Sequence, residues 1–150
     1  MNLLKKILNF QGRSKPIKHV RQKNISENGI ICAEIILKYF GVKVEKAQLY
    51  SDFGDISGGV SLLKIKSILS LYGLLVTPYK CGADNISEIK LPCILFWKLN
   101  QYVILTNIDS LHYHICDPAV KAKNILVDRD EFDCYFSDFV LEPNQTYIGS

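Results

Sequence analysis

Apolar residues recur at helical spacing through the first half of the chain. From Ser26 to Gly41 the pattern predicts one long helix, with Ser26 as its N-cap and Gly41 as its stop. A short helix is predicted around residues 45–50, and a second long helix runs from an N-cap at Ser61 to a stop at Gly73. Helices therefore dominate the first half of the sequence.

Short runs of β-type residues fill the second half. They cover residues 74–79, 93–99, 102–108, 112–116, 124–127 and 139–142. Helices followed by a run of hairpin-connected strands are typical of an α+β domain with an antiparallel sheet, and not of a parallel βαβ fold. No internal repeat or low-complexity linker interrupts this order.

Length and composition suit a single globular domain. A chain of 150 residues, 48% of them hydrophobic, buries enough surface to fold without metals or disulfides. The five cysteines are an odd number without a CxxC pair, and no signal peptide precedes them, which favours a reduced, cytoplasmic setting. The longest apolar stretches, such as residues 93–97, are far shorter than the roughly 20 residues of a membrane span.

The charge is distributed unevenly along the chain. Residues 1–23 carry seven basic residues and no acid, whereas the remainder carries 11 basic and 15 acidic residues. Leu3, Leu4, Ile7 and Leu8 lie at near-helical spacing within this basic leader, so it suits an anionic membrane surface or a partner protein, or else a solvated, frayed terminus. The acidic remainder shows no basic stripe, which argues against nucleic acid as a partner.

Three motifs that could bind a metal or a phosphate are incomplete. The acidic run at residues 128–133 lacks the glycine and the closing glutamate of a calcium loop, and is typical of a solvated helix start. His112 and His114 share a face of a predicted strand, but no third ligand completes a zinc site. The pair at residues 58–59 lacks a Walker lysine and indicates a turn. We therefore expect no metal or cofactor, and nucleotide hydrolysis would belong to another domain.

The remaining candidate chemistry is that of a cysteine nucleophile, and Cys32 lies within a predicted helix. It sits more than a turn inside the helix that opens at Ser26, between apolar neighbours. Apolar surroundings raise the pKa of a thiol and suppress its reactivity, so we expect Cys32 to pack in the core.

Several segments carry a family resemblance. The stretch from Val20-Arg-Gln22 to Glu27-Asn28-Gly29-Ile-Ile-Cys32-Ala33 resembles the signature of the C39 peptidase family, in which a glutamine precedes by six residues the cysteine of an acid-Cys-Gly motif. The resemblance continues in order through residues 59–62, 91–97, 100–105, 116–119 and 131–142. It implies a papain-like fold with N-terminal helices packed on the antiparallel sheet. The chain then divides into a basic leader (1–17), a C39-like domain (18–143) and a tail or linker (144–150).

The resemblance also implies a cellular setting. Such domains are N-terminal modules of bacterial ABC exporters, and the basic leader is similar to that of colicin V type exporters. We therefore expect a soluble domain on the cytoplasmic side of the inner membrane. Its expected partners are an exported polypeptide, the transmembrane and nucleotide-binding parts of the exporter and, through residues 1–23, an anionic membrane surface.

The catalytic residues of the family are not all present. The family's cysteine position is Asn28, whose amide cannot be activated as a thiolate, and its histidine position is Gln101, which does not titrate near neutral pH. Asp117 matches the orienting aspartate and Gln22 the oxyanion-hole glutamine. The resemblance therefore implies a degenerate domain without peptidase activity, in which Asn28 and Gln101 are expected to hydrogen-bond to each other.

C39-like domains without the catalytic residues also occur in hemolysin-type exporters. The resemblance to them implies that this domain docks the unfolded substrate near the transporter before export. A cleft of this origin is expected to keep apolar walls for an extended polypeptide. We expect Trp97 and Tyr102, which flank the Gln101 strand, to be exposed aromatic side chains of that cleft, with the sheet core as the alternative.

Two other readings remain open at this point. The first is an active cysteine peptidase that cleaves double-glycine leaders with Cys32 and either His114 or His112. The geometric objection is that Cys32 lies one helical turn, some 6 Å of rise, beyond the family's nucleophile position. The second is a free-standing regulatory or chaperone-like protein, which differs only in its covalent context.

Overall fold

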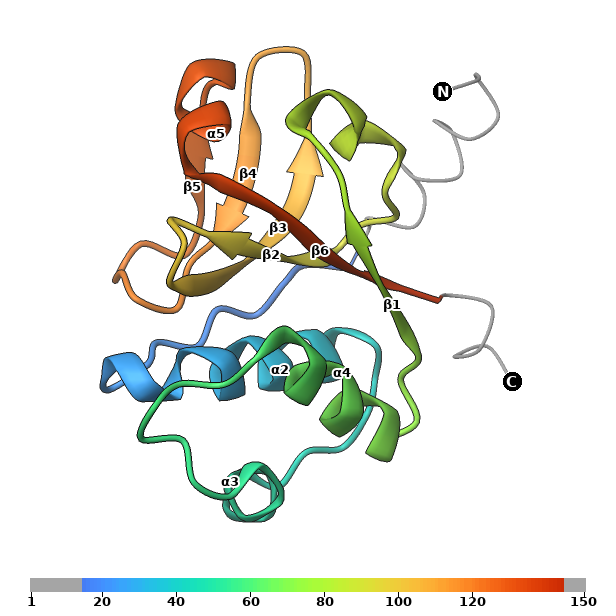
Figure 1. Ribbon diagram of the computed structural model, residues 1–150, viewed down its shortest axis with the longest axis vertical. Helices are drawn as coiled ribbons and strands as arrows, with labels where there is room; N and C mark the ends of the chain where they lie inside the picture. The colour runs from blue at the N-terminus through green and yellow to red at the C-terminus, as the bar shows by residue number, and fades with distance from the viewer. Residues whose placement is uncertain (1–14, 145–150) are drawn as a thin grey trace.

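The computed structural model describes residues 15–144 of the chain. Most of the predicted basic leader and nearly all of the C-terminal tail lie outside the described residues. Figure 1 shows two main layers, a twisted sheet and a group of helices packed beneath it. The helical layer contains the 3-10 helix η1 (Ile25–Glu27) and the helices α2 (Asn28–Tyr39), α3 (Lys46–Phe53) and α4 (Leu62–Leu71).

The first helix begins later than the sequence predicts. Ser26 does not cap it, because its hydroxyl donates to the side chain of Asn24 and a turn of 3-10 helix precedes α2. Glu27 accepts hydrogen bonds from the backbone N–H groups of Lys23 and Asn24, at 2.7 and 3.3 Å, which fixes this entry. The predicted N-cap of α4 is confirmed, since the Ser61 hydroxyl accepts from the backbone N–H of Lys64.

All strand pairs of the six-stranded sheet are antiparallel, which confirms the α+β class. The sheet order is β1-β6-β2-β3-β4-β5. The strands are β1 (Val76–Lys80), β2 (Cys93–Trp97), β3 (Gln101–Ile108), β4 (Tyr113–Cys116), β5 (Ile125–Val127) and β6 (Phe136–Pro143). The last strand is inserted between β1 and β2, so the sheet is not a simple succession of hairpins. The 3-10 helix η2 (Ala83–Glu88) was not predicted.

The acidic run at residues 128–133 forms the start of the helix α5 (Arg129–Tyr135), as predicted. Asp128 is its N-cap, and its carboxylate accepts from the backbone N–H of Glu131 at 2.9 Å. This use of the acidic side chains is a helix start and not a calcium loop.

Each face of the sheet covers its own hydrophobic core. Ile94, Tyr102 and Ile104 face the helical layer, whereas Leu95, Trp97 and Val103 face α5 and η2. The expected exposure of Trp97 is wrong, because the alternation of β2 turns it inward. Trp97 is 3% exposed, and its ring packs edge-on against Phe132 of α5. Tyr102 is also largely buried, at 7% exposure.

Gly29 allows the loop before α4 to approach the start of α2. A Cβ atom at this position would lie 2.1 Å from Cγ2 of Val60, a distance that no real side chain tolerates. The absence of a side chain on Gly29 therefore brings the 58–61 loop against the N-terminus of α2.

We predict that Gly29→Ala destabilises the protein. The added methyl must displace Val60, and such overpacking costs about 1–3 kcal/mol, which exceeds the helix-propensity gain of alanine over glycine, about 1 kcal/mol or less. Urea denaturation measures the change in the free energy of unfolding.

Two further variants separate the steric cause from other effects of the substitution. Gly58→Ala is the matched control, since a Cβ there meets nothing within 4 Å. Adding Val60→Ala to Gly29→Ala removes the clashing methyl and should recover part of the lost stability. An unchanged Gly29→Ala variant would contradict the close approach.

Candidate functional site

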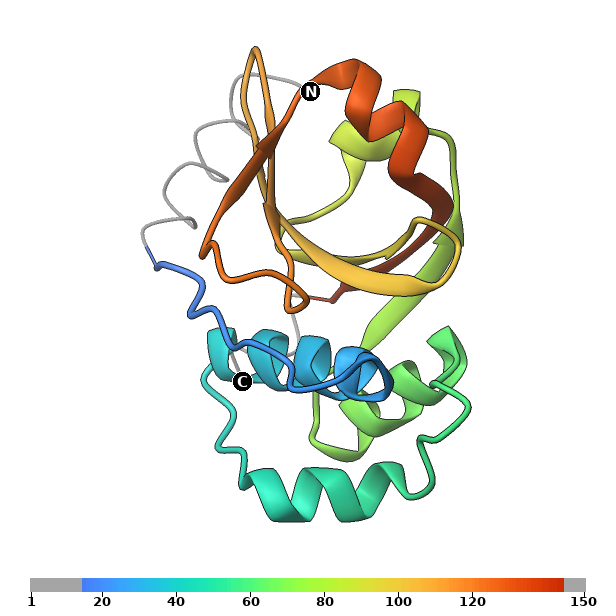
Figure 2. The same ribbon diagram turned by 90° about the vertical axis from the view of Figure 1, so that its left-hand side faces the viewer.

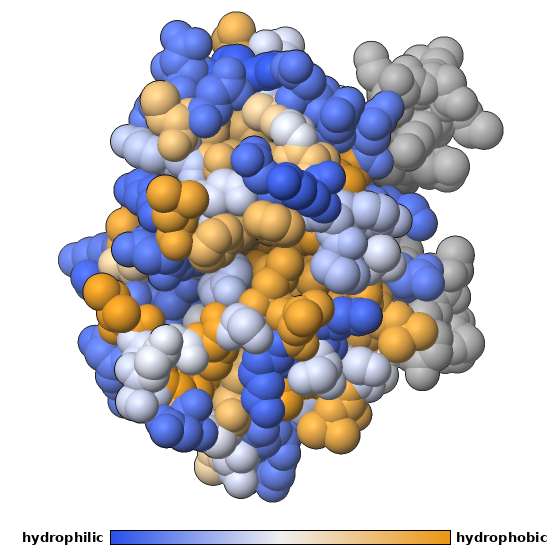
Figure 3. Space-filling view, viewed as in Figure 1, coloured by the Kyte–Doolittle hydropathy of each residue, from blue (hydrophilic) through white to orange (hydrophobic). Residues whose placement is uncertain are grey.

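A cleft of about 600 Å³ opens at the N-terminus of α2. Three segments form it: η1 with the start of α2, the 58–61 loop, and the β2–β3 hairpin. Its lining residues are Ile25, Ser26, Asn28, Gly29, Gly58, Gly59, Val60, Ser61, Phe96, Leu99, Asn100 and Tyr102. Hydrophobic side chains also gather across the middle of the face in Figure 3, between the sheet and the helical layer.

Asn28 lies at the base of this cleft, and its side chain is fixed by three hydrogen bonds. Nδ2 donates to Oε1 of Gln22 and to the carbonyl oxygen of Tyr102, both at 3.0 Å. Oδ1 accepts from the backbone N–H of Tyr102 at 2.6 Å. Asn28 is 6% exposed, so these bonds satisfy both amide donors and the oxygen of a buried group.

Gln101 does not form the predicted hydrogen bond with Asn28. Within residues 15–144 its side chain instead points toward Asp117, with Nε2 3.5 Å from Oδ2, a long contact. The neighbouring residue on β3, Tyr102, supplies the backbone groups that Asn28 binds. The physical reason is register: Gln101 and Tyr102 point their side chains to opposite sides of the strand.

Asp117 is buried and held in place by the backbone. Oδ1 accepts from the N–H of Ala119 at 2.9 Å, and its carbonyl oxygen lies 3.0 Å from Nε2 of His19. The N–H of Gln22 donates to the carbonyl of Pro118 at 2.9 Å. The four positions singled out from the sequence, Gln22, Asn28, Gln101 and Asp117, thus form one connected neighbourhood.

Tyr102 lines the cleft although little of it is exposed. Its hydroxyl donates to the carbonyl of Val60 at 2.8 Å, and its ring packs against Phe96. Tyr102 therefore joins the 58–61 loop to the sheet and forms an apolar wall of the cleft. Trp97, on the other face of the sheet, does not line this cleft.

Ile25 and Leu99 are rim residues that the sequence analysis missed. They are 86% and 79% exposed, although both are large apolar side chains. The signal was present in the sequence, since each is a single apolar residue within a polar turn, in Asn24-Ile25-Ser26 and Lys98-Leu99-Asn100.

The thiol of Cys32 is fully buried, as predicted. Sγ lies 3.4 Å from the carbonyl oxygen of Tyr102. Burial raises the pKa of Cys32 well above its ordinary value, and Cys116 and Asp117 raise it further. The two histidines considered as catalytic partners of Cys32 lie at or before β4. His112 is in the turn before β4, and the ring of His114 lies 2.7 Å from Oδ2 of Asp109.

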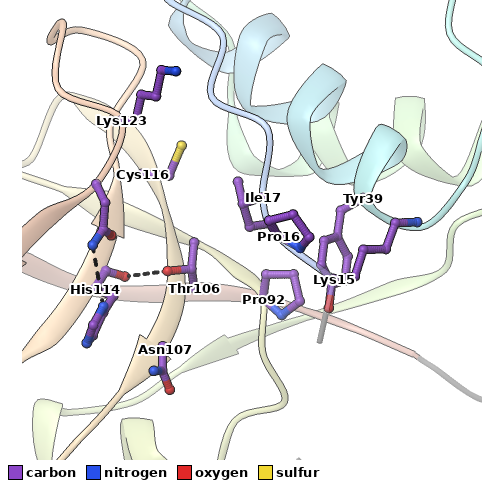
Figure 4. Close-up of a pocket in the computed structure, with 11 residues that line it drawn as sticks. Lys15, Pro16, Ile17, Tyr39, Pro92, Thr106, Asn107, His114, Cys116 and Lys123 are labelled. Atoms are coloured by element: carbon purple, nitrogen blue, oxygen red, sulfur yellow. Dashed lines mark hydrogen bonds between the residues drawn. The ribbon is translucent and has the colours of Figure 1, made fainter. Parts of the chain in front are cut away.

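A second, smaller cavity of about 270 Å³ lies between the N-terminal segment and the sheet. Figure 4 shows His114, Thr106 and Asn107 on one side of it and Pro16, Ile17 and Tyr39 on the other. The polar groups are engaged with one another: Thr106 donates to the carbonyl of His114, whose Nδ1 lies 3.5 Å from Asn124 Nδ2.

Among residues 15–144, no group of three or more His, Cys, Asp or Glu side chains could hold a metal ion. None of the helices in this part of the chain has the length and apolar character needed to cross a bilayer.

Comparison with known sequences points to one family. The model of the Peptidase C39 family matches residues 16–147. The chain is 28% identical over 130 residues to the probable microcin-H47 secretion/processing ATP-binding protein MchF and, equally, to the colicin V secretion/processing ATP-binding protein CvaB, both of Escherichia coli. Each match covers 87% of this chain but only 18% of the relative, so the chain spans about a fifth of their length.

Comparison with solved structures agrees. A double glycine motif protease from an AMS/PCAT transporter, in complex with a leader peptide, has a TM-score of 0.79 at 25% identity and covers 87% of this chain and 94% of that one. The peptidase domain of Streptococcus ComA has a TM-score of 0.76 at 18% identity, covering 86% and 100%. These structures share the predicted papain-like fold, with helices packed on an antiparallel sheet.

We predict that Asn28→Ala lowers the free energy of unfolding by about 1–3 kcal/mol, because the buried N–H of Tyr102 loses its acceptor. Urea denaturation followed by tyrosine and tryptophan fluorescence measures the change. Asn100→Ala, at an exposed position of the same cleft, is the matched control and should stay within about 0.5 kcal/mol of the unsubstituted chain. Equal stability of the two variants would contradict a structural role for the Asn28 amide.

Proposed function

The chain belongs to the peptidase C39 family, and we propose that it is a member that binds an exported polypeptide without cleaving it. The relatives it matches are bacterial secretion/processing ATP-binding proteins. By that similarity the partners would be the transmembrane and nucleotide-binding parts of an ABC exporter. The domain would work on the cytoplasmic side of the membrane, on a peptide of the bacteriocin class.

The observation that carries the proposal is the hydrogen bonding of Asn28 at the family's nucleophile position. The family resemblance puts this residue at the nucleophile position, and an amide nitrogen has no lone pair free to attack a carbonyl carbon. Its three hydrogen bonds engage both the nitrogen and the oxygen of the amide. The side chain thus serves as a structural tie between Gln22 and β3.

The position of the general base supports the same conclusion. Gln101 neither accepts nor releases a proton near neutral pH, although it still lies beside Asp117. Loss of a nucleophile in a comparable triad costs on the order of a million-fold in rate. Two amides at these two positions leave only groups that position or donate hydrogen bonds.

The cleft offers what polypeptide binding needs. Its volume of about 600 Å³ and its apolar walls at Val60, Phe96 and Tyr102 suit an extended segment with small and apolar side chains. Ile25 and Leu99 add exposed apolar surface at the rim. The double glycine motif protease with the same fold was solved with a leader peptide, and by similarity we assign such a peptide to this cleft.

A peptidase that uses Cys32 is the competing function. The buried thiol, with its raised pKa, has no access to a substrate, and its polar contact is with the backbone carbonyl of Tyr102. Cleavage measurements decide between the two.

We predict that the domain does not cleave leader peptides with a double-glycine motif. Incubation with such peptides, followed by mass spectrometry, should give intact peptide with the unsubstituted chain and with Cys32→Ala alike. Cleavage that disappears in Cys32→Ala would overturn the proposal and establish the alternative mechanism.

We predict that the same peptides bind in the cleft. Chemical-shift mapping should show changes at residues 25–29, 58–61 and 96–102. Leu99→Glu should weaken binding about tenfold or more, because a leucine side chain that becomes buried contributes about 1.5–3 kcal/mol. Leu111→Glu is the matched control, since Leu111 is 73% exposed and does not line the cleft. Equal loss in both variants would contradict this binding site.

A further inference from the structure

The N-terminal segment and the β4–β5 loop lie side by side on one face of the molecule. We call residues 15–23 the strap. It runs along α2 and is tied to the loop at residues 117–123 by two contacts, Gln22 N–H to the carbonyl of Pro118 and His19 Nε2 to the carbonyl of Asp117. Figure 2 shows the strap and the loop together on the side that faces the viewer.

These two segments carry six exposed basic side chains. They are Lys15, Lys18, Arg21, Lys23, Lys121 and Lys123. Residues 15–26 and 118–127 contain no acid. We call these six side chains the cationic face.

Within residues 15–144 the side chains of the cationic face form no ion pairs. Lys23 does act on Glu27, whose pKa is lowered partly by that lysine. Figure 4 shows Lys15 and Lys123 at the edge of the small cavity. The ammonium group of Lys15 lies over the ring of Tyr39, 5.6 Å from its centroid, a contact that leaves its positive charge uncompensated.

We propose that the cationic face docks on the surface of an anionic phospholipid bilayer. A lysine or arginine near such a surface contributes about 1 kcal/mol, so six of them on two adjacent segments give a strong attraction. The remainder of the chain beyond residue 23 has a net negative charge, which favours an orientation with this face toward the lipid.

The sequence that precedes the strap favours lipid over other anionic partners. Residues 1–14 contain Lys5, Lys6 and Arg13 with no acid, together with Leu3, Leu4, Ile7 and Leu8. Basic and apolar residues in one segment are the composition of membrane-surface anchors. The strap and the loop contain no Phe, Tyr or Trp, and aromatic residues are what single-stranded nucleic acid stacks on.

Docking through this face would fix how the cleft is oriented relative to the membrane surface. The strap leads directly into η1, and Ile25 and Ser26 of η1 line the cleft. A polypeptide held there would lie close to the lipid surface. The cationic face is a different surface from the cleft, so lipid docking does not depend on whether the domain binds a leader peptide.

The test is sedimentation of the full chain with lipid vesicles. We expect binding to vesicles of phosphatidylcholine mixed with phosphatidylglycerol, no binding to phosphatidylcholine alone, and steep weakening as salt rises to physiological strength. Lys121→Gln/Lys123→Gln should reduce affinity about 25-fold, at about fivefold for each lysine. Circular dichroism checks that the variants are folded.

A matched control carries the same change in charge at another place. Lys64→Gln/Lys66→Gln removes two exposed lysines of α4, which lies away from the strap in Figures 1 and 2, and should leave vesicle binding unchanged. Equal losses in the two double variants would overturn the proposal, as would an effect of Lys5→Gln/Lys6→Gln with none of Lys121→Gln/Lys123→Gln. Tighter binding to a single-stranded RNA than to the anionic vesicles would also overturn it.

Discussion

The hydrogen bonds between the Asn28 side chain and the backbone of Tyr102 join the two layers of the molecule at the site. They connect the first residue of α2 to β3, and a third bond from the same amide reaches Gln22 in the strap. The interaction uses only neutral groups, so it needs no buried charge at the base of the cleft. A thiolate or imidazolium in this place would require compensating charge, whereas an amide satisfies the backbone of β3 directly.

Much of the architecture follows from local sequence signals. Ser61 caps α4 and Asp128 caps α5 because their side chains can accept from backbone N–H groups three residues later. The strands of the second half follow from their β-type runs, and the papain-like arrangement follows from the family resemblance. The insertion of β6 between β1 and β2 could not be read from such signals, because strand order depends on contacts between distant residues.

The sequence predicted which four family positions lie together, but it missed the rim residues Ile25 and Leu99 and did not predict the hydrogen bonds. Gln22, Asn28, Gln101 and Asp117 do come together, but Asn28 binds the backbone of Tyr102 where a side-chain partner was expected. A hydrogen bond to a backbone group cannot be predicted from the identity of the partner residue, because every residue except proline carries the same backbone N–H and C=O. Trp97 was misplaced for a related reason: the face to which a strand residue points depends on register, and β2 is covered on both faces, so alternation of polar and apolar residues gave no guide.

The position of β6 also bears on how the domain assembles during synthesis. Residues 76–80 of β1 pair with residues 139–143 of β6, and in the described sheet β1 has β6 as its neighbour. The ribosome must therefore release more than sixty further residues before the edge strand finds its place. Until then β6 cannot occupy its place between β1 and β2, and the edges of β1 and β2 that pair with it have no partner strand. The proposed function is to bind unfolded polypeptides. During synthesis the unpaired β1 of the domain is itself such an extended segment until β6 is available to pair with it.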